Sequence, residues 1–81
     1  MAITVLYFAA LREALGIAEE NVELPGEISV ASLVKMLEQR RPALSGRLPS
    51  LRVAVNETFA SGTELVRPGD VVALIPPVAG G

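Results

Sequence analysis

Apolar and polar positions in the first third of the chain follow strand and helix patterns in turn. Residues 3–8 are rich in β-branched and aromatic side chains, which is typical of a strand. Residues 9–15 are strong helix formers with two leucines one turn apart, and Gly16 stands where a left-handed glycine commonly ends a helix. Residues 20–24 alternate weakly between apolar and polar, so they predict a second strand.

The middle of the chain carries the longest helical pattern. Four apolar residues follow the i, i+3, i+4, i+7 spacing of one helix face: Val30, Leu33, Val34 and Leu37. Ser29 precedes them as a candidate N-cap, and Pro42 is expected to stop the helix. Arg40 and Arg41 fall in its last turn, where we interpret them as cations that suit the helix dipole rather than as a recognition patch.

The remaining residues predict loops and two further strands. Residues 43–50 suggest a loop with a short helical turn, and residues 51–55 a strand with one apolar face. Residues 56–63 are rich in turn formers and are expected to expose Phe59. Residues 71–75 form a continuous apolar run, as expected of a strand covered on both faces.

The order of these elements predicts an α+β domain. Pro-Gly pairs at 25–26 and 68–69 predict turns, the first of them of type II. One long helix and four or five strands favour a mixed sheet packed on that helix. The first and last strands are the most apolar, so we expect them to lie side by side at the centre. With 81 residues, the chain has room for one modest core.

The first and last strands are apolar on both of their faces. A sheet with a helix on one side and water on the other should alternate apolar and polar residues, and these strands do not. We expect the short first helix and loops to cover part of the second face, and another protein to dock on the rest. Phe8, Phe59 and Ile75 are the candidate docking residues, although Phe59 alone could instead fold back on the core.

Composition excludes several classes of function. A net charge of −2 offers no basic patch for nucleic acid. No apolar run approaches the roughly 20 residues of a membrane-spanning helix, and no signal peptide is evident, so we expect a cytoplasmic protein with no membrane partner. The chain has no Cys and no His, which removes the thiolate nucleophile, the commonest general base and the usual metal ligands.

The carboxylate side chains do not take over the catalytic roles of the missing Cys and His residues. Glu19 and Glu20 are sequence neighbours, which we interpret as a solvated pair rather than as two carboxyl groups converging in a cleft. Side-chain catalysis is therefore poorly supported, and no bound metal or cofactor is expected. If the protein takes part in a reaction, its reactive group is expected to lie outside the side chains.

The last residues suggest where that group is. We expect a domain over residues 1–77 and an extended tail over 78–81. Pro76 and Pro77 stiffen the exit from the last strand, and four further residues extend about 13–14 Å. Val78 can anchor this tail in a partner. Ala79, Gly80 and Gly81 form a backbone thin enough to enter a narrow channel, because glycine has no Cβ.

The Gly81 carboxylate would then be the reactive group. It is ionised at neutral pH and can attack the α-phosphate of ATP to form an acyl-adenylate. A sulfur donor could displace AMP and leave a thiocarboxylate, whereas an amine would form an amide. A third possibility is an interaction module whose tail is inert.

Three motifs resemble the molybdopterin synthase small-subunit family, whose members are sulfur-carrying, ubiquitin-like β-grasp proteins. They are VLYFAALRE at 5–13, VAVNETF at 53–59 and RPGDVVALIPPVAGG at 67–81, and the similarity extends over the whole chain. Thiamine-pathway sulfur carriers are usually shorter and lack the first motif. A sulfur carrier for thiamine or for a tungsten cofactor, and a ubiquitin-like protein modifier, stay open as alternatives.

The resemblance implies a function inside a complex, with no turnover by the carrier alone. An E1-like activating enzyme would use ATP to adenylate Gly81, which then becomes a thiocarboxylate. The tail, with Gly80, would enter the large catalytic subunit and donate sulfur to cyclic pyranopterin monophosphate, in a heterotetramer of two small and two large subunits. Phe8, Phe59 and Ile75 match positions that contact the large subunit in relatives, although some relatives carry an aromatic residue in place of Ile75.

Overall fold

The computed structural model describes residues 2–77 and shows seven strands and two helices over that range. The strands are β1 (Ala2–Tyr7), β2 (Glu19–Glu23), β3 (Ile28–Ser29), β4 (Arg52–Val55), β5 (Thr58–Phe59), β6 (Leu65–Val66) and β7 (Val71–Ile75). The helices are α1 (Ala9–Leu15) and α2 (Val30–Arg40), followed by two short 3₁₀ turns, η1 (Pro42–Leu44) and η2 (Leu48–Ser50). The predicted tail, residues 78–81, lies outside the described residues.

Five strands form a mixed sheet in the order β2-β1-β7-β4-β5, and β3 pairs with β6 in a separate two-stranded ribbon. The first and last strands lie side by side at the centre, as predicted, and they run parallel with Val5 opposite Val72. The other pairs in the sheet are antiparallel. The α+β class and the mixed sheet packed on the long helix are therefore confirmed.

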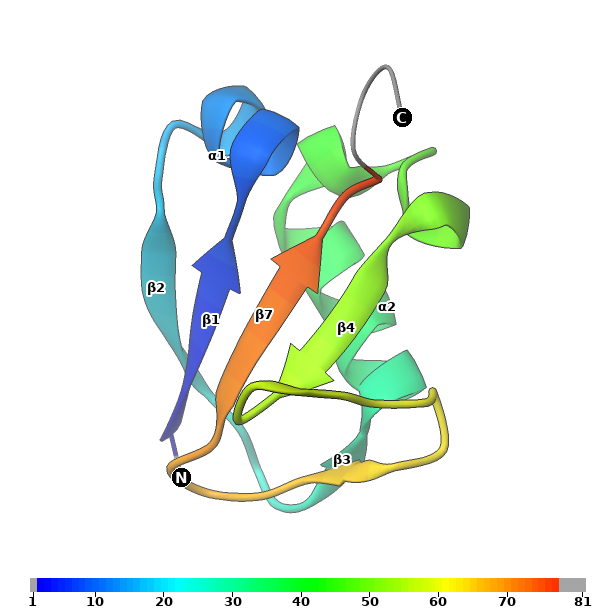
Figure 1. Ribbon diagram of the computed structural model, residues 1–81. Helices are drawn as coiled ribbons and strands as arrows, with labels where there is room; N and C mark the ends of the chain where they lie inside the picture. Colours follow the sequence, from blue (N-terminus) through cyan, green and yellow to red (C-terminus); the bar gives the residue numbers. More distant parts are fainter. Residues whose placement is uncertain (1, 78–81) are drawn as a thin grey trace.

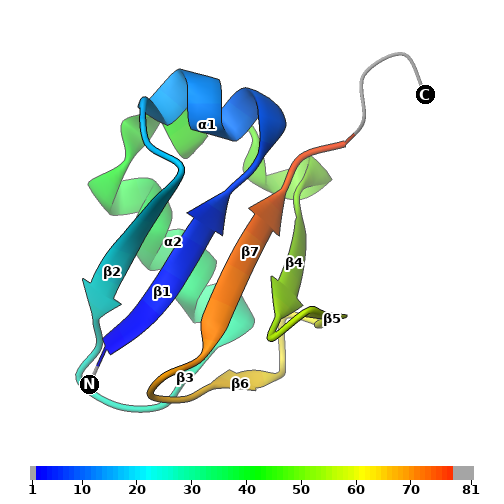
Figure 2. The same ribbon diagram turned by 60° about the vertical axis from the view of Figure 1, so that its left-hand side comes forward.

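Helix α2 crosses one face of this sheet, and α1 lies at the end of the sheet where β1 and β7 finish (Figures 1 and 2). Side chains that point from the sheet toward α2 are almost fully buried against the apolar face of the helix: Ile3, Val5, Tyr7, Val22, Val72 and Leu74 against Val30, Leu33 and Leu37. Leu11 brings α1 into the same core. Hydrophobic burial on this single side of the sheet fixes the register of every long strand.

The first turn of α2 has its backbone donors satisfied by neighbouring segments. Ser29 is the N-cap, as predicted, and its Oγ accepts a hydrogen bond from the Ser32 N–H at 3.1 Å. The Val30 and Ala31 N–H groups donate to the carbonyls of Glu64 and Gly62, at 2.8 and 3.0 Å. The loop before β6 is thereby fixed to the start of the helix.

The turns follow the backbone conformation that their residues allow. Gly16 ends α1 with φ of 76°, as predicted. Gly69 has φ of 83° in the second Pro-Gly turn, but Gly26 lacks a positive φ, so the type II turn predicted at 25–26 is wrong. Asn56 and Glu57 have φ of 50° and 70°, which is the type I′ geometry of a two-residue hairpin between β4 and β5.

One polar network joins this hairpin to the turn before β7. The Asn56 side-chain amide donates to the Asp70 carboxylate at 2.9 Å, and its oxygen accepts from the Val71 N–H at 2.9 Å. The second Asp70 oxygen accepts from the Arg67 N–H at 2.8 Å. These bonds set the relative positions of β4 and β7 at the end of the sheet opposite α1.

Candidate functional site

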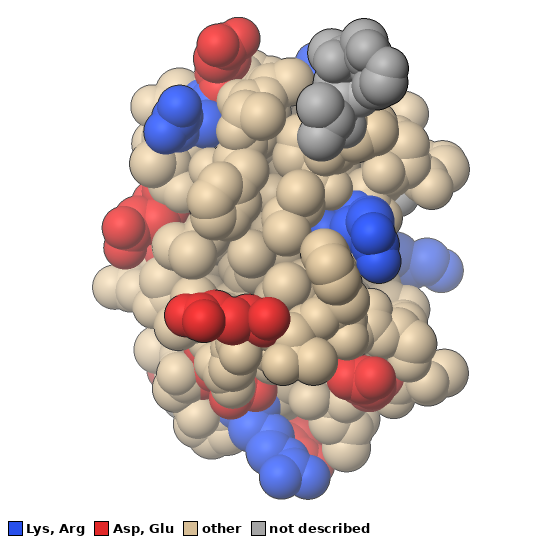
Figure 3. Space-filling view, in the orientation of Figure 1, with Lys and Arg blue, Asp and Glu red and all other residues tan. Residues whose placement is uncertain are grey.

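Within residues 2–77, no helix lies on the second face of the sheet (Figure 1). Cross-strand partners share a face, so the pairs Leu6–Ala73 and Ala54–Phe59 point away from α2. Val71 and Ile75, each two positions from Ala73 on β7, point the same way. We call the apolar residues of this side the open face: Leu6, Ala54, Phe59, Val71, Ala73 and Ile75. The space-filling view, in the orientation of Figure 1, shows uncharged surface over the middle of the sheet, with acidic and basic groups around it (Figure 3).

The expected cover by α1 is absent from the open face, because α1 packs at the end of the sheet with Leu11 in the core. The exposed fractions of Phe59 and Val71 are 54% and 38%. Phe59 therefore does not fold back on the core. Instead, the Arg52 guanidinium carbon lies 3.9 Å from the centroid of its ring, a cation–π contact that holds an aromatic side chain outside the core.

Phe8 lies at the junction between β1 and α1. The prediction placed it in the first strand, but β1 ends at Tyr7 and Phe8 is the N-cap of α1. Its backbone stays extended, with φ of −115° and ψ of 155°, so its side chain follows Leu6 onto the side of the open face. Phe8 is 44% exposed, and the next residue, Ala9, has φ of 49°, a left-handed conformation that costs a non-glycine residue about 1–2 kcal/mol.

The structure thus brings Phe8, Phe59 and Ile75 to the same side of the sheet. Ile75 is half-buried, ends β7 opposite Arg52, and is followed by Pro76. The open face therefore extends to the strand from which the predicted tail leaves. The other candidate site residues, Val78, Ala79, Gly80 and Gly81, lie outside the described residues.

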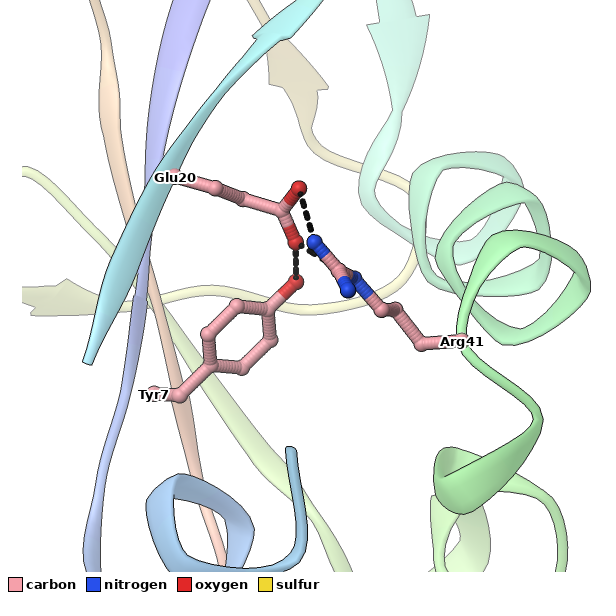
Figure 4. Close-up of polar contacts among 3 residues, drawn as sticks. All are labelled: Tyr7, Glu20 and Arg41. Atoms are coloured by element: carbon pink, nitrogen blue, oxygen red, sulfur yellow. Dashed lines mark hydrogen bonds and ion pairs between the residues drawn. The ribbon is translucent and has the colours of Figure 1, made fainter. Parts of the chain in front are cut away.

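A polar cluster that the sequence did not predict lies on the opposite side of the sheet (Figure 4). The Tyr7 hydroxyl donates to the Glu20 carboxylate at 2.5 Å, and the Arg41 guanidinium donates to both carboxylate oxygens at 3.1 and 2.9 Å. The interpretation of Glu20 as half of a solvated pair is therefore wrong. Arg41 likewise makes a specific bidentate ion pair rather than a general dipole interaction.

Protonation states in this cluster follow from its contacts. The hydrogen bond from Arg41 holds the pKa of the Glu20 carboxyl below its ordinary value, against the effect of desolvation. Burial raises the pKa of Tyr7 well above its ordinary value, and the hydrogen bond to Glu20 adds to that rise. Tyr7 is therefore a neutral donor at physiological pH. The cluster joins β1 and β2 to the end of α2, and we assign it a structural role.

We expect Glu20→Gln to lower the free energy of unfolding by about 1–2 kcal/mol at neutral pH, because Arg41 and Tyr7 lose a charged acceptor. A lowered native pKa stabilises the fold above the pKa of the unfolded chain, and this contribution disappears as pH falls through the native value. The difference between wild type and variant should therefore shrink below about pH 4. Urea unfolding across pH measures it, with Glu19→Gln as the exposed neighbouring control.

Among residues 2–77, no group of three acidic side chains could hold a metal ion. In the same range, no helix is long and apolar enough to cross a membrane.

Comparison with known proteins identifies the family. The model of the ThiS family matches residues 5–81. The molybdopterin synthase sulfur carrier subunit of Mycobacterium tuberculosis is 40% identical, with 98% of this chain and 96% of the relative covered. The human protein of the same description is 37% identical, with 98% and 93% covered. The chain belongs to the ThiS family and to its molybdopterin synthase sulfur carrier subunits.

Solved structures agree with the fold of this ThiS-family chain. SAMP1 from Haloferax volcanii has a TM-score of 0.89 at 29% identity, with both chains fully covered. A chain in the complex of subunits 1 and 2 of the molybdopterin-converting factor from Helicobacter pylori has a TM-score of 0.71 at 22% identity, again with both chains fully covered, and shows the fold alone. The ubiquitin-like β-grasp prediction is confirmed.

Two features of the open face escaped the sequence pattern. Arg52 is the second residue of the strand predicted over residues 51–55, and nothing in the apolar pattern predicts its contact with the ring of Phe59. Ala54 is too small to suggest an interface, yet it lies in the middle of the open face opposite Phe59. The period-two alternation of residues 51–55 could have placed both side chains on the face away from the helix.

Proposed function

We propose that the C-terminal carboxylate of Gly81 carries sulfur to the large subunit of molybdopterin synthase. A carboxylate oxygen attacks the α-phosphorus of ATP, the bond to the departing pyrophosphate breaks, and an acyl-adenylate forms. A sulfide-equivalent nucleophile then attacks the acyl carbon and AMP leaves, which gives a thiocarboxylate. In the large subunit, sulfur passes to cyclic pyranopterin monophosphate, and water restores the carboxylate.

The observation that carries this proposal is the match with molybdopterin synthase sulfur carrier subunits over nearly the whole length of the chain and of the relatives. The chemistry of the sequence supports it independently. A chain without Cys has no side-chain thiol on which to hold sulfur, so a terminal acyl group is the available carrier.

The open face is the proposed docking surface for the large subunit. It is apolar, it is not covered by a helix, and it reaches the end of β7, so a partner bound there can receive the segment that follows Pro77. The curated relatives at 37% and 40% identity are described as subunits of molybdopterin synthase, which supports a partner of this kind. We further propose a tetramer with two carriers on a large-subunit dimer.

An E1-like enzyme, which supplies the ATP site, is the second proposed partner. The carrier performs no turnover alone, because both reactions on Gly81 use groups held by other proteins. We place these reactions in the cytoplasm, where ATP and the activating enzyme are found together. The domain presents its terminus to each partner in turn.

Intact-mass spectrometry tests the proposal. After incubation with an E1-like activating enzyme, ATP and inorganic sulfide, the chain should gain the mass of one oxygen-to-sulfur exchange. Omission of ATP should prevent the gain. An unchanged mass with an enzyme that is active on its own carrier would contradict the proposal.

A second candidate function is protein modification. The structural similarity to SAMP1 and to small archaeal modifier protein 1 of Haloferax volcanii favours it. Both functions share the acyl-adenylate and differ in the nucleophile that displaces AMP. Isopeptide-linked adducts in cells would indicate modification in place of sulfur transfer. After tryptic digestion they are detected as lysines that carry residues 53–81, because Arg52 is the last cleavable basic residue and Pro68 blocks cleavage after Arg67.

A further inference from the structure

A groove lies between α2 and the β4–β5 hairpin, at the opposite edge of the sheet from β2. It has a volume of about 450 Å³. Its lining combines apolar side chains with two cations: Val30, Ala31, Val34, Leu51, Val53, Phe59, Ala60 and Gly62, with Lys35 and Arg52. A volume of this size accommodates one or two apolar side chains of a ligand.

The two cations have no acidic partner among residues 2–77. Arg41 and Arg67 form ion pairs, with Glu20 and Glu27 respectively. Lys35, the single lysine of the chain, and Arg52 have none within the described part of the protein, although acidic residues outnumber basic ones overall. Both side chains line the same apolar groove, which leaves a local positive charge there on a chain of net charge −2.

The groove has walls fixed by backbone contacts. A Cβ at position 62 would lie 3.3 Å from the Ala31 Cβ, so the loop approaches the helix very closely. The Ala31 N–H donates to the Gly62 carbonyl and the Val30 N–H to Glu64, which leaves these donors of α2 already occupied. Recognition of an anion in the groove therefore falls to the side chains of Lys35 and Arg52.

We propose that this groove binds an acidic, extended peptide segment of a partner protein. An apolar side chain of the segment enters the pocket between α2 and β4, and carboxylates before and after it pair with Lys35 and Arg52. Charge complementarity selects this occupant, because an uncharged apolar segment would leave both cations unpaired at the interface. The planar guanidinium of Arg52 suits bidentate binding of a carboxylate.

The groove continues from the open face. Phe59 and Arg52 belong to the lining of the groove, and Phe59 also belongs to the open face. A partner seated on the open face can therefore extend a segment around the β4–β5 edge of the sheet into the groove. The groove binds its segment whether or not Gly81 carries sulfur, so this inference goes beyond the proposed function and fails or succeeds independently of it.

Nuclear magnetic resonance titration of the ¹⁵N-labelled full chain tests the inference. The probes are acetylated, amidated pentapeptides with a central Leu, Val or Phe flanked by glutamates, together with the same peptides carrying glutamines. We expect saturable shifts at residues 30–35, 51–53 and 59–62 with the acidic set. The glutamine set should bind at least about tenfold more weakly, which corresponds to about 1.4 kcal/mol.

Charge reversal at the two cations provides the matched comparison. Lys35→Glu with Arg52→Glu should abolish binding of the acidic peptides, whereas Arg12→Glu with Arg40→Glu, an equal change in net charge outside the groove, should retain it. Dispersed spectra establish that both variants fold. The inference is overturned if no acidic peptide shifts the groove resonances at millimolar concentration, if the glutamine peptides bind equally well, or if both double variants lose binding alike.

Discussion

Deletion of Gly81 is expected to abolish formation of the thiocarboxylate while leaving the domain folded. The deletion draws the terminal carboxylate back by about 3.5 Å. A misplacement of about 1 Å can cost about a hundredfold in the rate of a positioned reaction, so we expect at least that loss in charging with sulfur. The core described for residues 2–77 is built from the sheet and both helices, so we expect thermal unfolding to be unchanged. Intact-mass kinetics and circular dichroism measure the two effects.

Addition of one glycine after Gly81 is the complementary variant. It restores length but moves the carboxylate past the position where the activating enzyme reacts with it, so it should be as defective as the deletion. A shortened chain that is charged with sulfur at the wild-type rate would show that the terminal acyl group is not the carrier. If only the extended chain still formed the thiocarboxylate, the requirement for one fixed tail length would be contradicted.

Truncation of the two exposed phenylalanines should separate docking from folding. Phe8→Ala with Phe59→Ala removes the most exposed aromatic side chains from the proposed docking surface, which are 44% and 54% exposed. Interface hot spots cost at least about 2 kcal/mol when truncated, so affinity for the large subunit should fall about thirtyfold or more. Isothermal titration calorimetry with the purified large subunit measures this change.

Leu65→Ala is the matched control for that experiment. Leu65 is a large apolar residue with 49% exposure, but it lies on β6, outside the sheet that carries the open face. We expect its truncation to leave affinity within about threefold of wild type, as is usual for residues outside an interface core. Equal losses for Leu65 and for the phenylalanine pair would show that the open face has no special role in docking.

The long helices and strands of this fold could be predicted because each one has a signal within its own residues. The spacing of Val30, Leu33, Val34 and Leu37 is a property of one helix face, and Ser29 caps that helix through its own side chain. The double-sided apolar character of β1 and β7 likewise predicted their central position, which the parallel pair confirms. Such signals need no knowledge of the rest of the molecule.

The short strands could not be predicted, because they depend on distant partners. Ile28–Ser29 and Leu65–Val66 are only two residues each, and they are strands because they pair with one another. The Tyr7–Glu20–Arg41 cluster has the same origin, since three separate elements must be in place before its hydrogen bonds form. Gly26 shows the opposite error, in which a favourable turn dipeptide takes another conformation.

The exposed residues of the candidate site could be predicted from the sequence, whereas the contact that holds Phe59 in place could not. Phe8, Phe59 and Ile75 were predicted from an excess of apolar surface, and the structure brings them to one side of the sheet. The contact that holds Phe59 outward depends on Arg52, which gives no local signal. Interactions of this kind arise only when two strands meet.

The parallel pairing of β1 with β7 has a consequence for the order of events during synthesis. Thr4 pairs with Val71, so the central strand pair of the sheet cannot form before the ribosome has translated residue 71. Long-range pairing of this kind delays folding until both strands are available. A partner that recognises the open face therefore meets it only on chains translated through β7, and nascent fragments escape premature capture.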